Sequence, residues 1–319
     1  MEEMMSNPKM RFYFREPMID TNLPLVEGTV QVDGFDLEVT DGEWDAIDHA
    51  FGALVEAKER GEAGVAIPAY PNRKFRQSYL QSRTSANISA ARDLVGRNVG
   101  ILAWSNSAGV WFRGALENYY GVDLRSVNWV ATRRDGSQIP DGISIEYLDL
   151  GKANPDHELD RLLLDGKLDA VLSPNVLPSV SSRDQRTGRV YRDYCSEEQR
   201  YYRETGIFPI SHVVTLKREF VERYPDAPVA LLKAYREARD IAIERISGSD
   251  PVILTISWAA YHLAQQQELM GEHYWPYNIE DNRTSLEAML EYSYQQGITS
   301  SKLDVMSFFD PTAAALAGY

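Results

Sequence analysis

The chain has 319 residues, a length that suits two domains better than one. Acidic residues number 47 and Lys plus Arg number 33, so the net charge is −14, which disfavours a protein that binds nucleic acid or an anionic membrane. With 44% hydrophobic and 25% charged residues the composition is globular and excludes wholesale disorder. Binding of a small anionic ligand is not excluded, because a local cluster of Arg residues can bind an anion on an acidic protein.

The predicted elements alternate between short β-type runs and longer helical runs, a pattern typical of an α/β protein. In chain order, the strands are predicted at residues 11–14, 65–69, 78–81, 98–102, 127–131, 144–147, 170–172 and 212–216. The helices are predicted at residues 45–60, 108–120, 157–164, 196–205, 217–224, 228–246, 253–270 and 282–296. The β-α-β-α-β order of the middle segment predicts a parallel sheet with right-handed crossovers, in a lobe inserted into a discontinuous outer one.

The cysteine count and the N-terminal sequence limit which metal sites, disulfides and cellular compartments we expect for this protein. The only cysteine is Cys195, so neither an intrachain disulfide nor a cysteine-based zinc site can form. The five histidines show no metal-site spacing, and we predict no metal. Residues 1–20 lack the pattern of a secretory signal, and the longest apolar run, 252–260, is too short for a membrane span. We therefore expect a cytoplasmic protein that does not bind membranes; homo-oligomerisation stays open.

The first candidate site is residues 100–113, which read as a strand, a polar loop and a helix. Ser105, Asn106 and Ser107 stand at the helix start, where free N–H groups and the helix dipole favour anions. Arg113 follows one to two turns along the helix. The alternative is a capped helix with a surface arginine.

The second candidate is the loop before residue 78, which holds Arg73, Lys74 and Arg76. Three cations within four residues of an acidic chain indicate an anionic partner, although such clusters are often simply solvated.

The third candidate is His212, which has apolar neighbours and is either a catalytic group or a hydrogen-bonded core histidine. The fourth is the aromatic segment around Trp275, which either stacks on a planar ligand or wedges a loop onto the core.

These segments together resemble the 4,5-dihydroxyphthalate decarboxylase family, which is related in fold to type 2 periplasmic solute-binding proteins. The resemblance rests on residues 65–78, 108–114, 169–174, 201–212 and 275–283, which occur in the family's order. It implies an α/β fold of two lobes with a ligand cleft between them. The lobes would be residues 1–80 with 212–319, and residues 81–211.

The resemblance also implies roles for individual residues. Arg76 and Arg113 would clamp a carboxylate, and His212 would act as proton donor or hydroxyl base. Either Trp111 or Trp275 would pack on the ring. Further residues around the cleft would be Arg73, Ser78, Ser105, Ser107 and Ser173.

Three positions depart from the family's pattern. Gln77 stands where the family usually has His, Asn175 where it often has Arg, and His49 where it usually has no His. These changes point to fewer carboxylates on the substrate or to another acid. They also leave His49 as a second candidate proton donor and Asn175 as a candidate substrate contact.

The predicted function is a cofactor-independent, non-oxidative decarboxylase of a hydroxylated aromatic carboxylic acid. Such a reaction needs a held carboxylate and a proton for the ring, which Arg and His supply. Two alternatives stay open: a solute-binding protein for a small carboxylate, and another enzyme of the same fold that acts on a carboxylated ring. In each case the partner is a small aromatic or related carboxylate.

Overall fold

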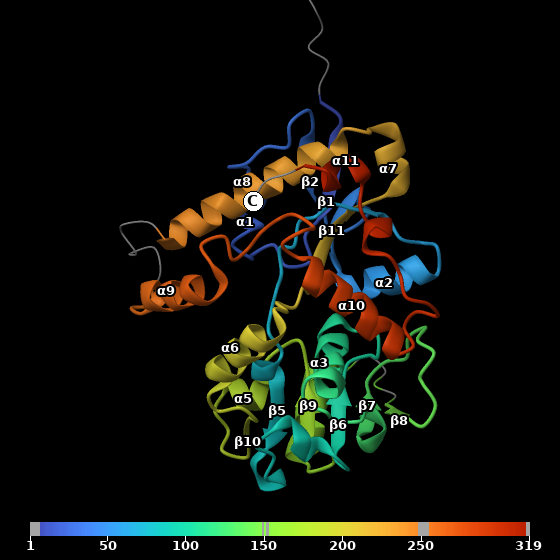
Figure 1. Cartoon of the computed structure of the whole chain (residues 1–319), viewed down its shortest axis with the longest axis vertical. Helices are drawn as coiled ribbons and strands as arrows, with labels where there is room; N and C mark the ends of the chain where they lie inside the picture. Colours follow the sequence, from blue (N-terminus) through green and yellow to red (C-terminus); the bar gives the residue numbers. More distant parts are fainter. Residues whose placement is uncertain (1–6, 149, 151–152, 248–254, 317–319) are drawn as a thin grey trace, which may run out of the picture.

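The computed structural model describes residues 7–148, 150, 153–247 and 255–316. Two sheets form two α/β lobes, one above the other in Figure 1. No helix among these residues is long and apolar enough to cross a membrane.

The sheet of the first lobe has five strands in the order β2-β1-β3-β11-β4. Strand β1 runs parallel to β2 and β3, whereas β11 is antiparallel to β3 and β4. The carboxyl ends of β1, β3 and β4 therefore meet the amino end of β11 at one edge. The strands are β1 (Lys9–Tyr13), β2 (Asp36–Val39), β3 (Ala46–Ala50), β4 (Val65–Ala66) and β11 (His212–Leu216). The helices of this lobe are α1 (Leu23–Val26), α2 (Phe51–Glu59), α7 (Arg218–Arg223), α8 (Ala227–Ser247), α9 (Ala259–Met270), α10 (Arg283–Gln295) and α11 (Pro311–Ala314).

The sheet of the second lobe has six strands in the order β10-β5-β9-β6-β7-β8. Strands β6, β7, β8 and β9 run parallel, which confirms the predicted β-α-β-α-β unit. The strands are β5 (Leu80–Arg83), β6 (Asn98–Ile101), β7 (Asn128–Ala131), β8 (Ser144–Tyr147), β9 (Ala170–Leu172) and β10 (Thr187–Arg189). The helices are α3 (Ser107–Asn118), α4 (Pro155–Leu164), α5 (Pro178–Ser181) and α6 (Tyr194–Thr205).

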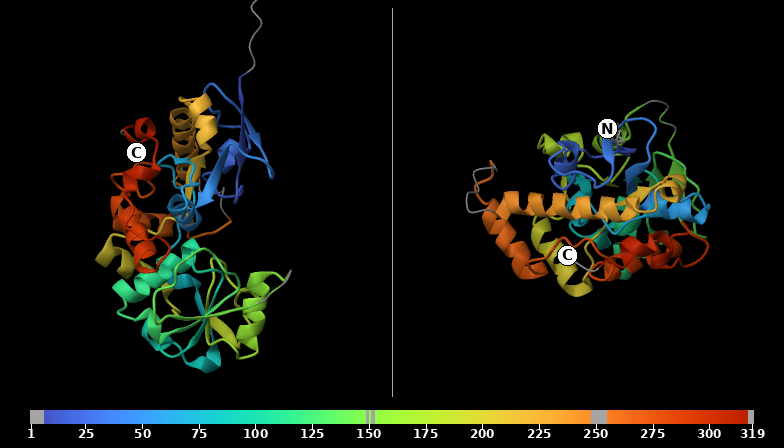
Figure 2. Two further views of the ribbon diagram at one scale, coloured as in Figure 1. Left: turned by 90° about the vertical axis from the view of Figure 1, so that its right-hand side faces the viewer. Right: turned by 90° about the horizontal axis from the view of Figure 1, so that it is seen from above.

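The chain passes between the lobes at two places. One is the 3-10 turn Gln77–Tyr79 that leads into β5, and the other is residues 206–211, which lead from α6 into β11. The left view of Figure 2 shows the two lobes, with the C-terminal helices on one side of the first sheet. Helix α10 packs on α3 of the second lobe, and the indole of Trp104 donates to the carbonyl oxygen of Gln296 at 2.7 Å. The C-terminal helices thereby fasten the two lobes along this side.

The predicted helix at residues 45–60 is wrong in its first part. Residues Ala46–Ala50 form β3, and only Phe51–Glu59 are helical. Three consecutive β3 residues, Ala46, Ile47 and Asp48, are buried, so the strand lacks the alternation that distinguishes a strand from a helix in sequence. The predicted strand at 78–81 begins two residues later, at Leu80. Strands β2 and β10 were not predicted. Helix α9 begins at Ala259, and residues 253–254 of its predicted range lie outside the described residues.

Candidate functional site

The candidate site lies where the strand ends of the two sheets face each other. His212 opens β11 at the edge of the first sheet, and Ser105 follows β6 at the edge of the second. The edges touch, because the backbone N–H of Gly52 at the start of α2 donates to Ser107 Oγ at 2.8 Å. A Cβ atom on Gly52 would overlap the carbonyl oxygen of Ser105, so this approach requires glycine. Ligands of open α/β sheets bind at such strand ends.

A buried carboxylate lies beside His212. Asp48 is fully buried, and its Oδ2 is 3.7 Å from Nδ1 of His212. The backbone N–H of Arg15 donates to Asp48 Oδ1 at 2.5 Å, and the side-chain amide of Asn22 donates to Oδ2 at 3.3 Å. Nδ1 of His212 is buried and has no hydrogen-bond partner among the described residues. A small rotation of the ring would let Nδ1 donate to the carboxylate, which is the usual way to fix the orientation of a histidine in proton transfer.

The second candidate histidine, His49, has a different environment. Burial, the positive charge of Arg15 and the neighbouring His212 together lower the pKa of His49 to about 4. His49 is therefore neutral near pH 7 and holds no extra proton to donate. This favours His212 over His49 as the proton donor.

Arg76 is a buried cation with unused donors. Its side chain is 3% exposed, and Nη2 donates to Ser211 Oγ. Nε and Nη1 are buried and have no partner among the described residues. Burial lowers the pKa of Arg76 to about 10, so the guanidinium stays charged near neutrality. Because Ser211 precedes His212, this hydrogen bond ties the cation to the segment that carries the imidazole.

Ser78 serves the site through its backbone. Its N–H donates to Oε1 of Glu198 at 2.9 Å, and its carbonyl oxygen accepts from Nε of Arg189 at 2.9 Å. Burial raises the pKa of Glu198, although the nearby Arg76 counters this effect. These contacts hold the first crossing segment against the second lobe.

The start of α3 is occupied by groups of the protein itself. The backbone N–H of Ser105 donates to Oδ2 of Asp135 at 2.7 Å, and Asn106 caps the helix by accepting from the N–H of Ala108 at 3.2 Å. The Ser107 hydroxyl accepts from Gly52. The helix start therefore lies where the sequence predicts it, Asp135 holds the donor of Ser105, and an anion-binding role for this start stays a prediction.

Ser173 and Asn175 both contact Asp156. Ser173 Oγ donates to Oδ1 at 2.6 Å, and Asn175 Nδ2 donates to Oδ2 at 2.8 Å. Asn175 is exposed and held by Asp156, whereas the fully buried Ser173 supports the loop.

Arg113 is a buried cation whose side chain reaches back along α3 to the segment between β6 and the helix start. It is fully buried and stacks on Trp104, with 3.8 Å between the guanidinium carbon and the ring centroid. Nε donates to the side-chain oxygen of Gln296 at 2.9 Å, and Nη2 donates to the carbonyl oxygen of Trp104. Nη1 of Arg113 is buried and has no partner among the described residues, as in Arg76, while Nε ties α3 to the residue after α10. Arg113 therefore stays a predicted carboxylate contact, and the proposed site is built on Arg76.

Three further predicted residues also turn toward α10 and the crossing segment. Arg73 donates to Asn282 Oδ1 at 2.7 Å, and the indole of Trp275 donates to the carbonyl oxygen of Tyr70 at 3.0 Å. The indole of Trp111 is buried and donates to the carbonyl oxygen of Ile210 at 2.7 Å. We therefore assign neither Trp111 nor Trp275 to substrate stacking, and we leave Arg73 out of the strand-end site.

The sequence reasoning missed Asp48, Glu198 and Ser211. Asp48 lay in the segment misread as a helix, and Glu198 lies on a polar helix with many similar residues. No sequence signal separates these residues from surface groups. Among the described residues, no group of three or more His, Cys, Asp or Glu side chains is arranged to hold a metal ion.

Comparison with known proteins confirms the resemblance seen in the sequence. No family model matches the chain. A curated 4,5-dihydroxyphthalate decarboxylase of Comamonas testosteroni is 25% identical over 316 residues, which cover 92% of this chain and 94% of that protein. A 4,5-dihydroxyphthalate decarboxylase of Pseudomonas putida is 28% identical over 202 residues, which cover 56% and 76%. The chain is therefore similar to these decarboxylases, in the first case over nearly its whole length.

Solved structures confirm the fold class, a two-lobed α/β fold like that of type 2 periplasmic binding proteins. The periplasmic aliphatic sulphonate binding protein SsuA from Escherichia coli matches with a TM-score of 0.56 and 13% identity, covering 95% of this chain and 98% of that one. The desulfurization enzyme DSZB matches with a TM-score of 0.50 and 17% identity, covering 96% and 97%. The fold therefore occurs in binding proteins and in enzymes, and function has to come from the site.

Proposed function

We propose that the protein is a carboxy-lyase that removes CO₂ from a hydroxylated aromatic carboxylic acid without oxidation and without a cofactor. The similarity to two named decarboxylases supports the carboxy-lyase class. One observation carries the proposal: Arg76, a buried cation with unused hydrogen-bond donors, lies close to His212, which has the carboxylate of Asp48 beside it. Arg76 and His212 are linked through Ser211, and Asp48 lies behind the imidazole.

Arg76 supplies the carboxylate contact. A buried guanidinium without an ion pair lowers the stability of the folded protein unless a ligand supplies the missing negative charge. The N–H groups of Nε and Nη1, which have no partner, suit a carboxylate. If Arg76 bound the departing carboxylate, it would stabilise the substrate more than neutral CO₂ and would slow the reaction. We therefore place on Arg76 a carboxylate that stays on the ring, as a phthalate-type diacid provides.

His212 supplies the proton. The imidazolium donates to the ring carbon that bears the leaving carboxylate, and a C–H bond forms there. The bond between that carbon and the carboxylate then breaks, its electron pair restores the aromatic ring, and CO₂ leaves. His212 is reprotonated from water. Asp48 orients the ring, so its role is positioning.

The second carboxylate of the substrate is the part of this proposal that needs its own test, because Gln77 and Asn175 depart from the family's pattern. The relatives are named for 4,5-dihydroxyphthalate, and loss of one carboxylate from that compound gives 3,4-dihydroxybenzoate. The test is to incubate the purified protein with 4,5-dihydroxyphthalate and with hydroxybenzoates, and to measure released CO₂ and the decarboxylated product. We expect product with the diacid.

A matched pair of variants makes this experiment specific. His212→Asn should abolish most turnover, whereas His157→Asn, on the exposed start of α4, should leave it unchanged. A ligand that binds and is recovered intact would contradict the proposal and favour a solute-binding protein. Turnover of another carboxylated ring alone would keep the enzyme and change its substrate.

A further inference from the structure

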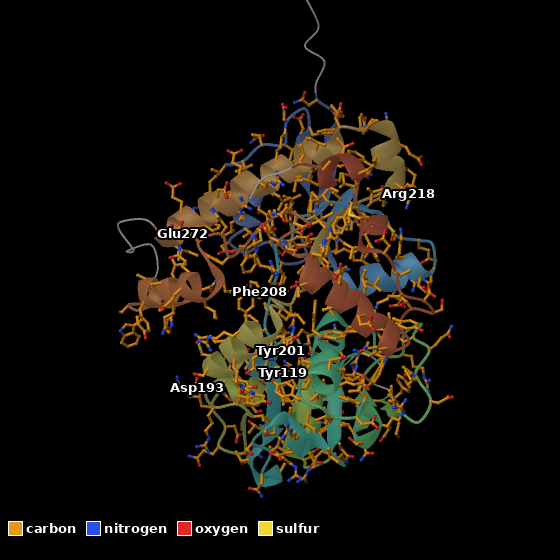
Figure 3. All side chains as sticks on the ribbon, in the orientation of Figure 1. Tyr119, Asp193, Tyr201, Phe208, Arg218 and Glu272 are labelled. Atoms are coloured by element: carbon orange, nitrogen blue, oxygen red, sulfur yellow. The ribbon has the colours of Figure 1, made fainter. Side chains whose placement is uncertain are left out.

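A cavity lies beside the crossing segments, on the side of α9 and α10. Its volume is about 350 Å³. Tyr202 of α6 and Phe208 of the second crossing segment line one wall, and Met270 and the loop after α9 line the other. In Figure 3, Phe208 marks the junction of the two lobes and Glu272 marks the loop after α9. The cavity is therefore shared by the two lobes.

Arg73 lines this cavity and has no acidic partner. Its side chain is 7% exposed, and its guanidinium stacks on Phe208, with 4.2 Å between the guanidinium carbon and the ring centroid. It donates only to neutral acceptors, Asn282 Oδ1 at 2.7 Å and the carbonyl oxygen of Phe208 at 2.9 Å. Nε is buried without a partner, and no carboxylate lies within ion-pair distance among the described residues. By contrast, Lys74 has Glu16 at 3.9 Å.

We propose that this cavity is a binding site for a small organic anion with one carboxylate and one ring. The buried charge of Arg73 lacks the counter-ion that buried charges ordinarily have, and a carboxylate would supply it. The volume is near the lower end of the ~300–1,000 Å³ typical of ligand sites, which suits a single ring. The lining side chains of Tyr202, Phe208 and Met270 offer apolar contact to such a ring.

Two acids limit the charge of the ligand. Glu272 and Asp281 also line the cavity, and they would repel a second negative charge. A monoanion is therefore favoured over a diacid, which is the opposite of the preference that we derive for Arg76. The site is independent of the proposed reaction, because none of its residues belongs to the Asp48, His212 and Arg76 group.

Binding here would act on the contact between the lobes. A ligand held between α6 and the loop after α9 fixes these two walls relative to each other.

The test uses 4-fluorobenzoate as the probe and ¹⁹F NMR of the full-length protein. We expect saturable binding that Glu272→Lys strengthens by about 2- to 5-fold, as expected for one exposed charge near an anion. Glu146→Lys, an exposed acid on β8, is the matched control and should leave the affinity unchanged. Arg73→Gln should weaken binding at least tenfold, whereas Arg76→Gln should not change this site.

Several results would overturn the proposal. They are absence of saturable binding, an affinity that does not respond to Glu272→Lys, and binding that only Arg76→Gln removes. Since Glu272 is exposed, its substitution tests the site even if Arg73→Gln fails to fold. None of these results bears on whether the diacid is decarboxylated, so the two proposals fail separately.

Discussion

Replacement of Arg76 by Met should have opposite effects on stability and on ligand binding. In the free protein, Nε and Nη1 of Arg76 are buried without partners, and each unsatisfied group costs about 1–3 kcal/mol. Arg76→Met removes both costs and the buried charge, keeps a side chain of similar length, and loses one charge-assisted hydrogen bond to Ser211, which contributes about 1.5–3 kcal/mol. We therefore expect the free energy of unfolding of the ligand-free protein to rise by about 1 kcal/mol or more.

The same substitution removes the charged donors that a carboxylate would use. A hydrogen bond to a charged group contributes about 1.5–3 kcal/mol, so the dissociation constant should increase by about 10- to 150-fold. Urea unfolding measures the first effect, and calorimetric titration with 4,5-dihydroxyphthalate measures the second.

Arg73→Met is the matched control for Arg76→Met. Arg73 is equally buried but donates to both Asn282 and Phe208, so its loss leaves two acceptors unpaired and should lower the free energy of unfolding. The reasoning would be refuted if Arg76→Met destabilised the protein as much as Arg73→Met does and left ligand affinity unchanged.

Two further predictions concern pH and the contact between the lobes. Folding lowers the pKa of His49 from 6.5 to about 4, so between these pH values the unfolded chain binds a proton more readily than the folded one. The free energy of unfolding should therefore fall as the pH drops from about 6.5 to 4, by up to about 3 kcal/mol. Urea unfolding at several pH values should show that His49→Gln reduces this loss and that His157→Gln does not. Gly52→Ala should lower the free energy of unfolding by about 1–3 kcal/mol through overlap with Ser105, whereas Gly42→Ala, which meets only ordinary contacts, should not. Equal stability of the two glycine variants would contradict this packing.

Most of the fold follows from local pattern. The strands at 144–147, 170–172 and 212–216 match the sequence-based prediction to the residue, and most helices differ by one to three residues. The exception at residues 45–60 has a physical cause. Strand β3 is buried and continues directly into α2, so no turn residue or alternation marks the boundary. Short edge strands such as β2 carry too few residues to show a pattern.

The site was predictable only in part. The motif order placed Arg76 and His212 in one site, and the structure brings their segments together through Ser211. Arg113 reaches the segment before α3 because helical side chains lean toward the N-terminus, whereas its contact with Gln296 joins residues far apart in sequence and shows no local pattern. The position of the Asp48 side chain depends on contacts with Arg15 and with the loop that follows Arg15. These residues are distant from Asp48 in sequence, so no local pattern reveals the contact.

The decarboxylation claim is tested most directly by measuring binding and CO₂ release on the same samples of parent protein and His212→Asn. With carboxyl-labelled 4,5-dihydroxyphthalate, the account predicts that both proteins bind the ligand with similar affinity. The parent should release labelled CO₂, and the variant should be slower by about 10²- to 10⁴-fold, the share of general acid–base catalysis. Tight binding by the parent with no labelled CO₂ released, or equal release by both proteins, would contradict it.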